Sequence, residues 1–205
     1  MRSLDLLHGK TLLIFDFDGT IADTSEMHAI AFREVLSPLG ISVNYADIAG
    51  LKTADAIRAS ARAAGKHLDD STVENLVLLK QAAARSLIRA SIQPLPGVAS
   101  FLEKVRARYR IAMVSSGSRG TVELALAGLG YHEFFDPLIC ADDVVAAKPD
   151  PEGFLKALDL SGCSAADALV FEDSDAGVEA ATAAGIDCWD VRQTPFTAVE
   201  ARCCA

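Results

Sequence analysis

Four short apolar segments, separated by longer amphipathic stretches, constrain the fold of this chain more than any other feature. They are residues 11–15 (TLLIF), 111–114 (IAMV), 168–171 (ALVF) and 188–191 (CWDV), with a shorter fifth at 138–140 (LIC). Such segments are typical of strands covered on both faces of a parallel sheet. The intervening stretches place apolar residues three and four positions apart, which predicts helices. The alternation predicts an α/β fold with a doubly wound, Rossmann-like parallel sheet.

Residues 25–93 differ from the rest of the chain, because they have helical periodicity throughout and no convincing strand. Within them, residues 71–74 (STVE) have the form of a capping box at a helix start. Residues 93–97 (QPLPG) have the composition of a return linker. We therefore expect a helical cap domain at residues 25–93, inserted into an α/β core made of residues 1–24 and 94–205.

The charge of the chain argues against two classes of partner. It has 19 Lys and Arg against 28 Asp and Glu, a net charge of −9, which would repel a nucleic-acid backbone and an anionic membrane surface. No apolar run approaches the roughly 18 residues of a membrane span. The five cysteines form no Cys-x-x-Cys pair, so we expect free thiols. These observations predict a cytoplasmic monomer whose partner is a small molecule.

Reactive side chains follow the predicted strands. Ligands of open parallel sheets bind beyond the carboxyl ends of the strands, so residues at these positions are the first candidates for a functional site. The candidates are Asp16, Asp18, Gly19, Thr20, Ser115, Ser116, Lys148, Glu172 and Asp173. Carboxylates that meet at one sheet edge repel each other unless a cation neutralises them. Mg²⁺ suits such oxygen ligands, and it commonly binds one or two carboxylates together with a substrate phosphate.

The remaining candidates fit a phosphate beside that ion. Lys148 can place its ammonium between the phosphate and a nucleophilic carboxylate. Gly19 and Thr20 can turn backbone N–H groups toward an anion. Ser115 can donate its hydroxyl to a phosphoryl oxygen, and Ser116 takes that place if the strand runs one residue longer. The candidates together predict a site for a small phosphorylated metabolite.

The spacing of Asp16 and Asp18 suggests a division of labour. Strand alternation sends side chains two residues apart to similar sides, so one acid can attack phosphorus while the other handles a proton. The expected path runs from Asp16 to an aspartyl phosphate. Asp18 would protonate the departing alcohol and later take a proton from the attacking water. An EF-hand loop has a different spacing, because here Gly19 follows Asp18 directly.

In these motifs and their order, the chain resembles the haloacid dehalogenase superfamily of phosphotransferases. The motifs are Asp16-x-Asp18-Gly19-Thr20, a strand-end Ser115, Lys148-Pro149 and Glu172-Asp173, and the resemblance spans residues 12–192. The helical insertion looks like the type 1 cap of β-phosphoglucomutase and sugar-phosphate phosphatases.

The resemblance also implies roles for the residues. Asp16 would be the nucleophile, Asp18 the acid/base, and Ser115 and Lys148 the phosphate binders. Asp16, Asp18 and Asp173 would surround Mg²⁺, with Glu172 supporting the metal site. His28 falls on the cap-hinge histidine of the subgroup.

Lys52 leaves two alternatives open. It resembles the Schiff-base lysine of phosphonoacetaldehyde hydrolases, but those relatives carry Ala where this chain has Asp18. With Asp18 present, we expect Lys52 either to contact the substrate from the cap or to be merely exposed.

The function that these observations predict is a Mg²⁺-dependent phosphatase of small phosphorylated metabolites, foremost sugar phosphates. A sugar-phosphate mutase is the nearest alternative, and a receiver-like module switched by Asp phosphorylation is another. Receivers lack the cap insertion. A mutase must hold a second phosphate, and β-phosphoglucomutases do so with a cap lysine followed closely by an arginine. Here Arg58 is six positions after Lys52 with Asp55 between them, so the sequence favours water as the acceptor.

Overall fold

Five parallel strands form the centre of the structure, a computed structural model that describes residues 7–198. The strands are Leu12–Phe15 (β1), Arg110–Val114 (β2), Leu138–Ile139 (β3), Ala168–Glu172 (β4) and Asp187–Asp190 (β5). Their order across the sheet is β3-β2-β1-β4-β5, which places β1 at the centre. The predicted α/β fold with a doubly wound parallel sheet is confirmed, and because all strands are parallel, their carboxyl ends share one edge.

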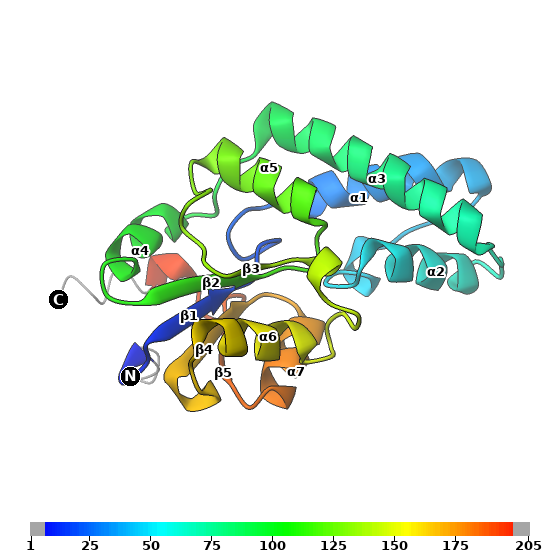
Figure 1. Cartoon of the computed structure of the whole chain (residues 1–205). Coiled ribbons are helices and arrows are strands. Elements are labelled where there is room, and N and C mark those ends of the chain that lie inside the picture. Colours follow the sequence, from blue (N-terminus) through cyan, green and yellow to red (C-terminus); the bar gives the residue numbers. More distant parts are fainter. Residues whose placement is uncertain (1–6, 199–205) are drawn as a thin grey trace.

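Helices cover both faces of the sheet (Figure 1). One face carries Val98–Val105 (α4) and Arg119–Leu129 (α5), and the other carries Glu152–Ser161 (α6) and Asp175–Ala183 (α7). Strand β1 serves both layers, because its side chains alternate: Leu13 and Phe15 pack into the cluster with α4 and α5, and Leu12 and Ile14 into the cluster with α6 and α7. This double burial explains why β1 has no polar residue.

A helical insertion, residues 25–91, leaves the sheet after β1 and returns before α4. Its helices are Ser25–Leu36 (α1), Thr53–Ala63 (α2) and Asp70–Ser91 (α3), with short 3₁₀ helices at Ser37–Leu39 and Tyr45–Asp47. The insertion has a hydrophobic cluster of its own, which includes Phe32, Leu36, Ile57, Val73 and Leu76. Helix α3 also packs against α5, so the insertion rests on one face of the sheet domain (Figure 1).

The starts of two helices are fixed by aspartate carboxylates that accept a backbone N–H. Helix α3 begins at Asp70, and the cap is Asp69, whose carboxylate accepts a hydrogen bond from Thr72 N–H at 2.7 Å. The capping box predicted at Ser71 is therefore wrong, because the preceding aspartate takes the capping position. Helix α5 begins at Arg119, where a distant carboxylate, that of Asp142, accepts the Arg119 N–H at 2.6 Å.

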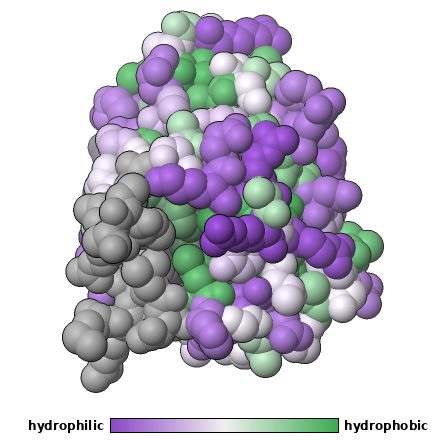
Figure 2. Space-filling model, turned by 90° about the vertical axis from the view of Figure 1, so that its left-hand side faces the viewer, coloured by the Kyte–Doolittle hydropathy of each residue, from purple (hydrophilic) through white to green (hydrophobic). Residues whose placement is uncertain are grey.

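The surface at the end of the molecule where the strands begin carries both hydrophilic and apolar side chains. On the face shown in Figure 2, hydrophilic side chains predominate, with smaller apolar areas between them. Within residues 7–198, no helix has the length and hydropathy needed to cross a membrane. Cys140, Cys163 and Cys188 are free thiols, and Cys203 and Cys204 lie outside the described residues.

Gly177 provides a test of how tightly the sheet edge is packed. A Cβ at this position in the first turn of α7 would lie 2.0 Å from Cδ of Glu172. Glu172 is only 1% exposed and is held by hydrogen bonds, so it has no room to move aside. We expect Gly177→Ala to lower the free energy of unfolding by about 1–3 kcal/mol, measured by urea denaturation.

Gly120→Ala is the matched control, because Gly120 lies in the first turn of α5. A Cβ there would meet only the flexible end of Arg85, at 3.2 Å. Since Ala favours a helix more than Gly does, we expect no loss of stability. Equal losses in the two variants would contradict the packing argument.

Candidate active site

The carboxyl end of β1 presents two acids on the same side of the chain. Asp16 continues the strand ladder, because its N–H donates to Phe171 O at 3.0 Å. Phe17 turns the opposite way and is buried in the hydrophobic cluster beneath α4 and α5. Asp16 and Asp18 therefore both line one cavity, as the alternation predicted.

Lys148 joins three strand ends. Its ammonium donates to Asp16 Oδ1 at 2.6 Å, to Glu172 Oε2 at 2.7 Å and to Val114 O at 3.0 Å. All three charged groups are buried. Burial by itself would lower the pKa of Lys148, but the charges of Asp16 and Glu172 raise it above its ordinary value. The lysine is therefore a permanent cation between two carboxylates.

Glu172, beside Lys148, is fixed by hydrogen bonds to both of its carboxylate oxygens. Its other oxygen, Oε1, accepts the N–H groups of Asp173 and Ser174, both at 3.0 Å, and the Ser174 hydroxyl at 2.9 Å. Both carboxylate oxygens thus already have donors. This arrangement holds Glu172 in place and orients the loop that carries Asp173.

Asp16, Glu172 and Asp173 form a cluster that fits a metal ion. Oxygen atoms of the three carboxylates lie within 4.8 Å of one another. Burial and then the charge of Glu172 raise the pKa of Asp16 well above its ordinary value, and the same two causes raise the pKa of Asp173 to about 7. Asp173 Oδ1 is buried without a hydrogen-bond partner among the described residues. One lysine does not balance these acids, so the residues fit a divalent cation.

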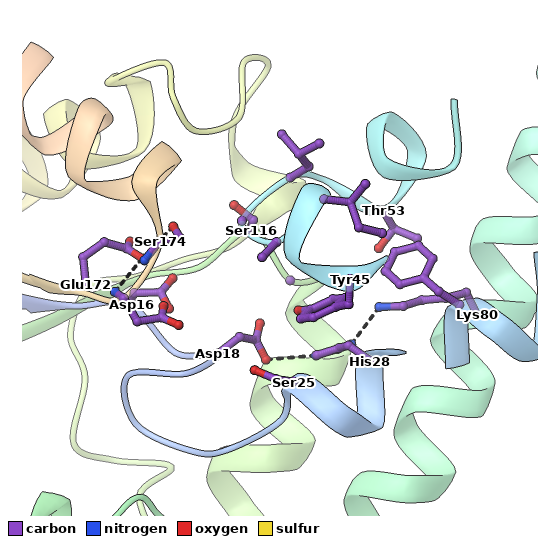
Figure 3. A pocket seen from close by; sticks show the side chains of 17 residues that line it. Asp16, Asp18, Ser25, His28, Tyr45, Thr53, Lys80, Ser116, Glu172 and Ser174 are labelled. Atoms are coloured by element: carbon purple, nitrogen blue, oxygen red, sulfur yellow. Dashed lines mark hydrogen bonds and ion pairs between the residues drawn. The ribbon is translucent and has the colours of Figure 1, made fainter. Parts of the chain in front are cut away.

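The second acid, Asp18, is held in a different environment (Figure 3). Its Oδ1 accepts the Thr24 hydroxyl at 2.5 Å and lies 2.9 Å from His28 Nε2. Burial alone would raise the pKa of Asp18, but His28, Thr24 and the charge of Lys80 together lower it to about 2. Asp18 is therefore a carboxylate at neutral pH, stabilised by groups of the helical insertion and the segment that leads into it.

Lys80 is a site residue that the sequence analysis missed. Its ammonium, on α3, lies 2.7 Å from His28 Nδ1 and 4.4 Å from the centre of the Phe32 ring. It is 5% exposed, and burial lowers its pKa to about 8. A signal was present, because Lys80 continues the spacing of the buried residues Val73, Leu76, Ala84 and Ile88 and so is a lysine on an apolar face.

The two candidate serines are placed differently. Ser115 is buried, and its hydroxyl accepts the Gly117 N–H at 3.0 Å. Ser116 lines the cavity with Asp16 and Asp18, and Figure 3 shows its hydroxyl at that cavity. Ser115 and Ser116 both line the neighbouring hollow that contains Lys148, and the Ser115 hydroxyl keeps its own proton as a donor, so both stay candidates for a phosphoryl oxygen.

Gly19 and Thr20 do not present their N–H groups as predicted. The Gly19 N–H donates to Ala22 O at 2.9 Å and the Thr20 N–H to Phe17 O at 3.3 Å, so both are used within the turn. Thr20 is fully buried. Gly19 instead permits a close approach: its φ is +84°, and a Cβ there would lie 1.9 Å from Asp173 Oδ2.

Lys52 reaches the sheet domain at another point. Its ammonium donates to Val144 O at 2.6 Å and to Val145 O at 3.1 Å. These carbonyls belong to the loop that leads to Lys148. The structure thus brings Lys52 against the wall beside the site rather than into the cavity that Asp16 and Asp18 line.

The cavity lies between the strand ends and the insertion, and its volume is about 50 Å³. Acids from the sheet domain line one side, and His28, Tyr45 and Lys80 from the insertion line the other. A space of this size holds a few water molecules. The arrangement combines a lysine-bound carboxylate, a metal-binding cluster and a second carboxylate with its own cationic support.

We expect Lys80 to lower the free energy of unfolding, because its charge is buried. Between pH about 8 and the ordinary lysine value of 10.5 the unfolded state binds more protons than the native state, so this group makes stability rise with pH across that window. Below that pH window Lys80 is charged in the native protein, and its burial lowers the free energy of unfolding. We expect Lys80→Met to raise the free energy of unfolding at pH 7 by about 1–2 kcal/mol, and to lose most of that gain at pH 10.5.

Urea denaturation at the two pH values measures the effect. Lys66→Met, at an exposed position of the same insertion, is the control and should show no such gain. A Lys80→Met protein that is less stable than the parent at pH 7 would show that the ion is net stabilising.

Comparison with known proteins agrees with this geometry. A family model described as haloacid dehalogenase-like hydrolase matches residues 13–191. Fructose-1-phosphate phosphatase YqaB of Escherichia coli (strain K12) is 35% identical over 180 residues, which cover 88% of this chain and 95% of that protein. A phosphorylated carbohydrates phosphatase of Thermotoga maritima is 30% identical over 179 residues, which cover 85% of this chain and 82% of that protein.

A solved structure shares the fold over most of the chain. β-Phosphoglucomutase from Clostridium difficile superposes with a TM-score of 0.81 at 23% identity, covering 93% of this chain and 96% of that one, which is a likeness of fold. The matched family model extends from β1 through β5 and includes Asp16, Lys148 and the Glu172–Asp173 pair. The resemblance seen in the sequence motifs is therefore confirmed: this chain belongs to the haloacid dehalogenase-like hydrolase family.

Proposed function

We propose that the protein is a Mg²⁺-dependent phosphatase that hydrolyses small sugar phosphates through an aspartyl phosphate on Asp16. The observation that carries this proposal is that two aspartates line one cavity but have different hydrogen-bond partners. Asp16 is bound by Lys148 and is surrounded by other acids, whereas Asp18 is bound by His28 and Thr24. Two carboxylates whose pKa values are pushed in opposite directions suit a nucleophile and a proton carrier.

Lys148 prepares the nucleophile. It binds Asp16 Oδ1, which leaves the second carboxylate oxygen to attack phosphorus. A Mg²⁺ ion held by Asp16 and Asp173 would supply the charge that lets a phosphate approach these acids. As the bond between Asp16 and phosphorus forms, the bond to the alcohol oxygen breaks. Ser115 or Ser116 would donate its hydroxyl to a phosphoryl oxygen.

Asp18 carries the proton in both steps. A phosphate dianion beside it raises its pKa, so Asp18 gains a proton when substrate binds and gives it to the departing alcohol oxygen. In the second step water attacks phosphorus and Asp18 takes its proton. Asp16 then leaves as a carboxylate with release of inorganic phosphate. The low pKa of Asp18 in the free site favours this return to the carboxylate.

The charges on the insertion side favour water over a second sugar phosphate as acceptor. Among the described residues that line the cavity, the lysine on this side is Lys80, and it is already engaged with His28. Lys52 is bound to backbone carbonyls. Arg58 pairs with Asp70 at 2.8 Å and lies in a separate hollow. A mutase needs cations for the phosphate that is not reacting, and these residues do not offer them.

The relatives' names support the same class of substrate, because two of those at 30–35% identity are named as phosphatases of fructose 1-phosphate and of phosphorylated carbohydrates.

Phosphorus NMR tests the proposal directly. We expect the protein with Mg²⁺ to release inorganic phosphate from β-glucose 1-phosphate or fructose 1-phosphate, with no need for glucose 1,6-bisphosphate. Asp16→Asn should lower the rate by about 10³-fold or more, because an amide does not attack phosphorus. Accumulation of glucose 6-phosphate faster than inorganic phosphate would instead identify a mutase.

Metal dependence has a readout that does not need turnover. We expect EDTA to stop hydrolysis, Mg²⁺ to restore it and Ca²⁺ to restore it poorly, because the larger ion is more loosely coordinated. Mg²⁺ should also raise the thermal unfolding temperature of the parent but not of Asp173→Asn. Asp175→Asn, two positions along the chain and outside the acidic cluster, is the control and should respond like the parent. Full activity in metal-free buffer would refute the metal site.

A further inference from the structure

Tyr45 lies at the boundary between the insertion and the cavity. It begins the short helix Tyr45–Asp47, between α1 and α2. Its ring lies nearly parallel to that of His28, with centroids 6.3 Å apart and 14° between the planes, and it also packs beside Phe32. Since His28 and Phe32 are themselves buried, the tyrosine ring has a defined orientation.

The hydroxyl group of Tyr45 is aimed at the reacting groups. Figure 3 shows it pointing out of the insertion toward Asp18 and the cavity. Burial, and then the charges of Asp18, Asp173 and Asp16, raise the pKa of Tyr45 above its ordinary value. The phenol therefore stays protonated and acts as a hydrogen-bond donor at neutral pH.

This donor has no partner within the described part of the chain, although its neighbours are paired. His28 lies between Asp18 and Lys80, at 2.9 and 2.7 Å, so its two ring nitrogens are both engaged. The Tyr45 hydroxyl, in contrast, takes part in none of the hydrogen bonds of the site. A donor that faces a ligand cavity without a partner is positioned to bind the ligand.

We propose that Tyr45 is a specificity-determining residue. Its hydroxyl binds a substrate hydroxyl on the carbon adjacent to the carbon that carries the phosphate ester. Asp18 gives its proton to the ester oxygen itself. Tyr45 lies beside Asp18 on the insertion side, where the rest of the alcohol must lie. The acids around the cavity disfavour an anionic group there, so the partner is a neutral oxygen. This inference rests on the proposed phosphatase function, and it selects phosphates of sugars and polyols over simple alkyl phosphates.

Two small substrates isolate this hydroxyl. Glycerol 1-phosphate and propane-1,3-diol monophosphate differ only in the hydroxyl on the carbon next to the ester carbon. We expect the parent protein to prefer glycerol 1-phosphate by at least tenfold in kcat/KM. Tyr45→Phe removes only the phenolic oxygen, and it should reduce this preference to less than threefold, mainly by slowing hydrolysis of glycerol 1-phosphate.

The controls separate this inference from the proposed function. Tyr131→Phe, at a buried tyrosine of the sheet domain that packs against Phe134, should keep the parent's preference. Thermal unfolding checks that Tyr45→Phe is folded. Equal kcat/KM values of the parent for the two substrates, or a preference that Tyr45→Phe retains, would overturn the role of Tyr45. Undiminished hydrolysis by Asp16→Asn would overturn the phosphatase mechanism instead.

Discussion

The ammonium group of Lys148 is the interaction on which the arrangement of the site depends. It is buried between Asp16 and Glu172, and it also binds the carbonyl at the end of β2. An unpaired charge at this depth would be very costly, so the strand ends that carry its partners must meet closely. The parallel sheet makes this possible, because neighbouring strands β2, β1 and β4 all end at the same edge.

The helical insertion contributes electrostatics as well as cover. The sheet domain concentrates negative charge at its edge, and burial with mutual repulsion raises the pKa values of Asp16 and Asp173. On the other side of the cavity, His28 and Lys80 lower the pKa of Asp18. Two aspartates two residues apart thus differ in protonation behaviour because different parts of the fold surround them. Movement of the insertion would change the support of Asp18 and leave that of Asp16 in place.

Several site residues were readable from the sequence because their signals are local. Asp16 and Asp18 come shortly after β1, and Glu172 and Asp173 lie at the end of β4. The parallel sheet places residues at such positions together whatever the details of packing. The N–H groups of Gly19 and Thr20 were misassigned, since the turn consumes them internally. Local patterns also did not separate Ser115 from Ser116, because a shift of one residue at a strand end reverses the side that a side chain faces.

Hydrophobic periodicity over short windows was enough to predict the α/β alternation and the place of the helical insertion, and the acids could be read directly at the end of each apolar segment. Only the tertiary structure decided that Lys80 meets His28 across 52 residues and that Lys52 meets Val144 across 92. It also decided that the Tyr45 hydroxyl faces Asp18. The Lys80–His28 contact depends on how α1 and α3 pack within the insertion, and the other two depend on how the insertion packs on the sheet domain. Both kinds of packing are set by the complementarity of whole surfaces, which no short window of sequence contains.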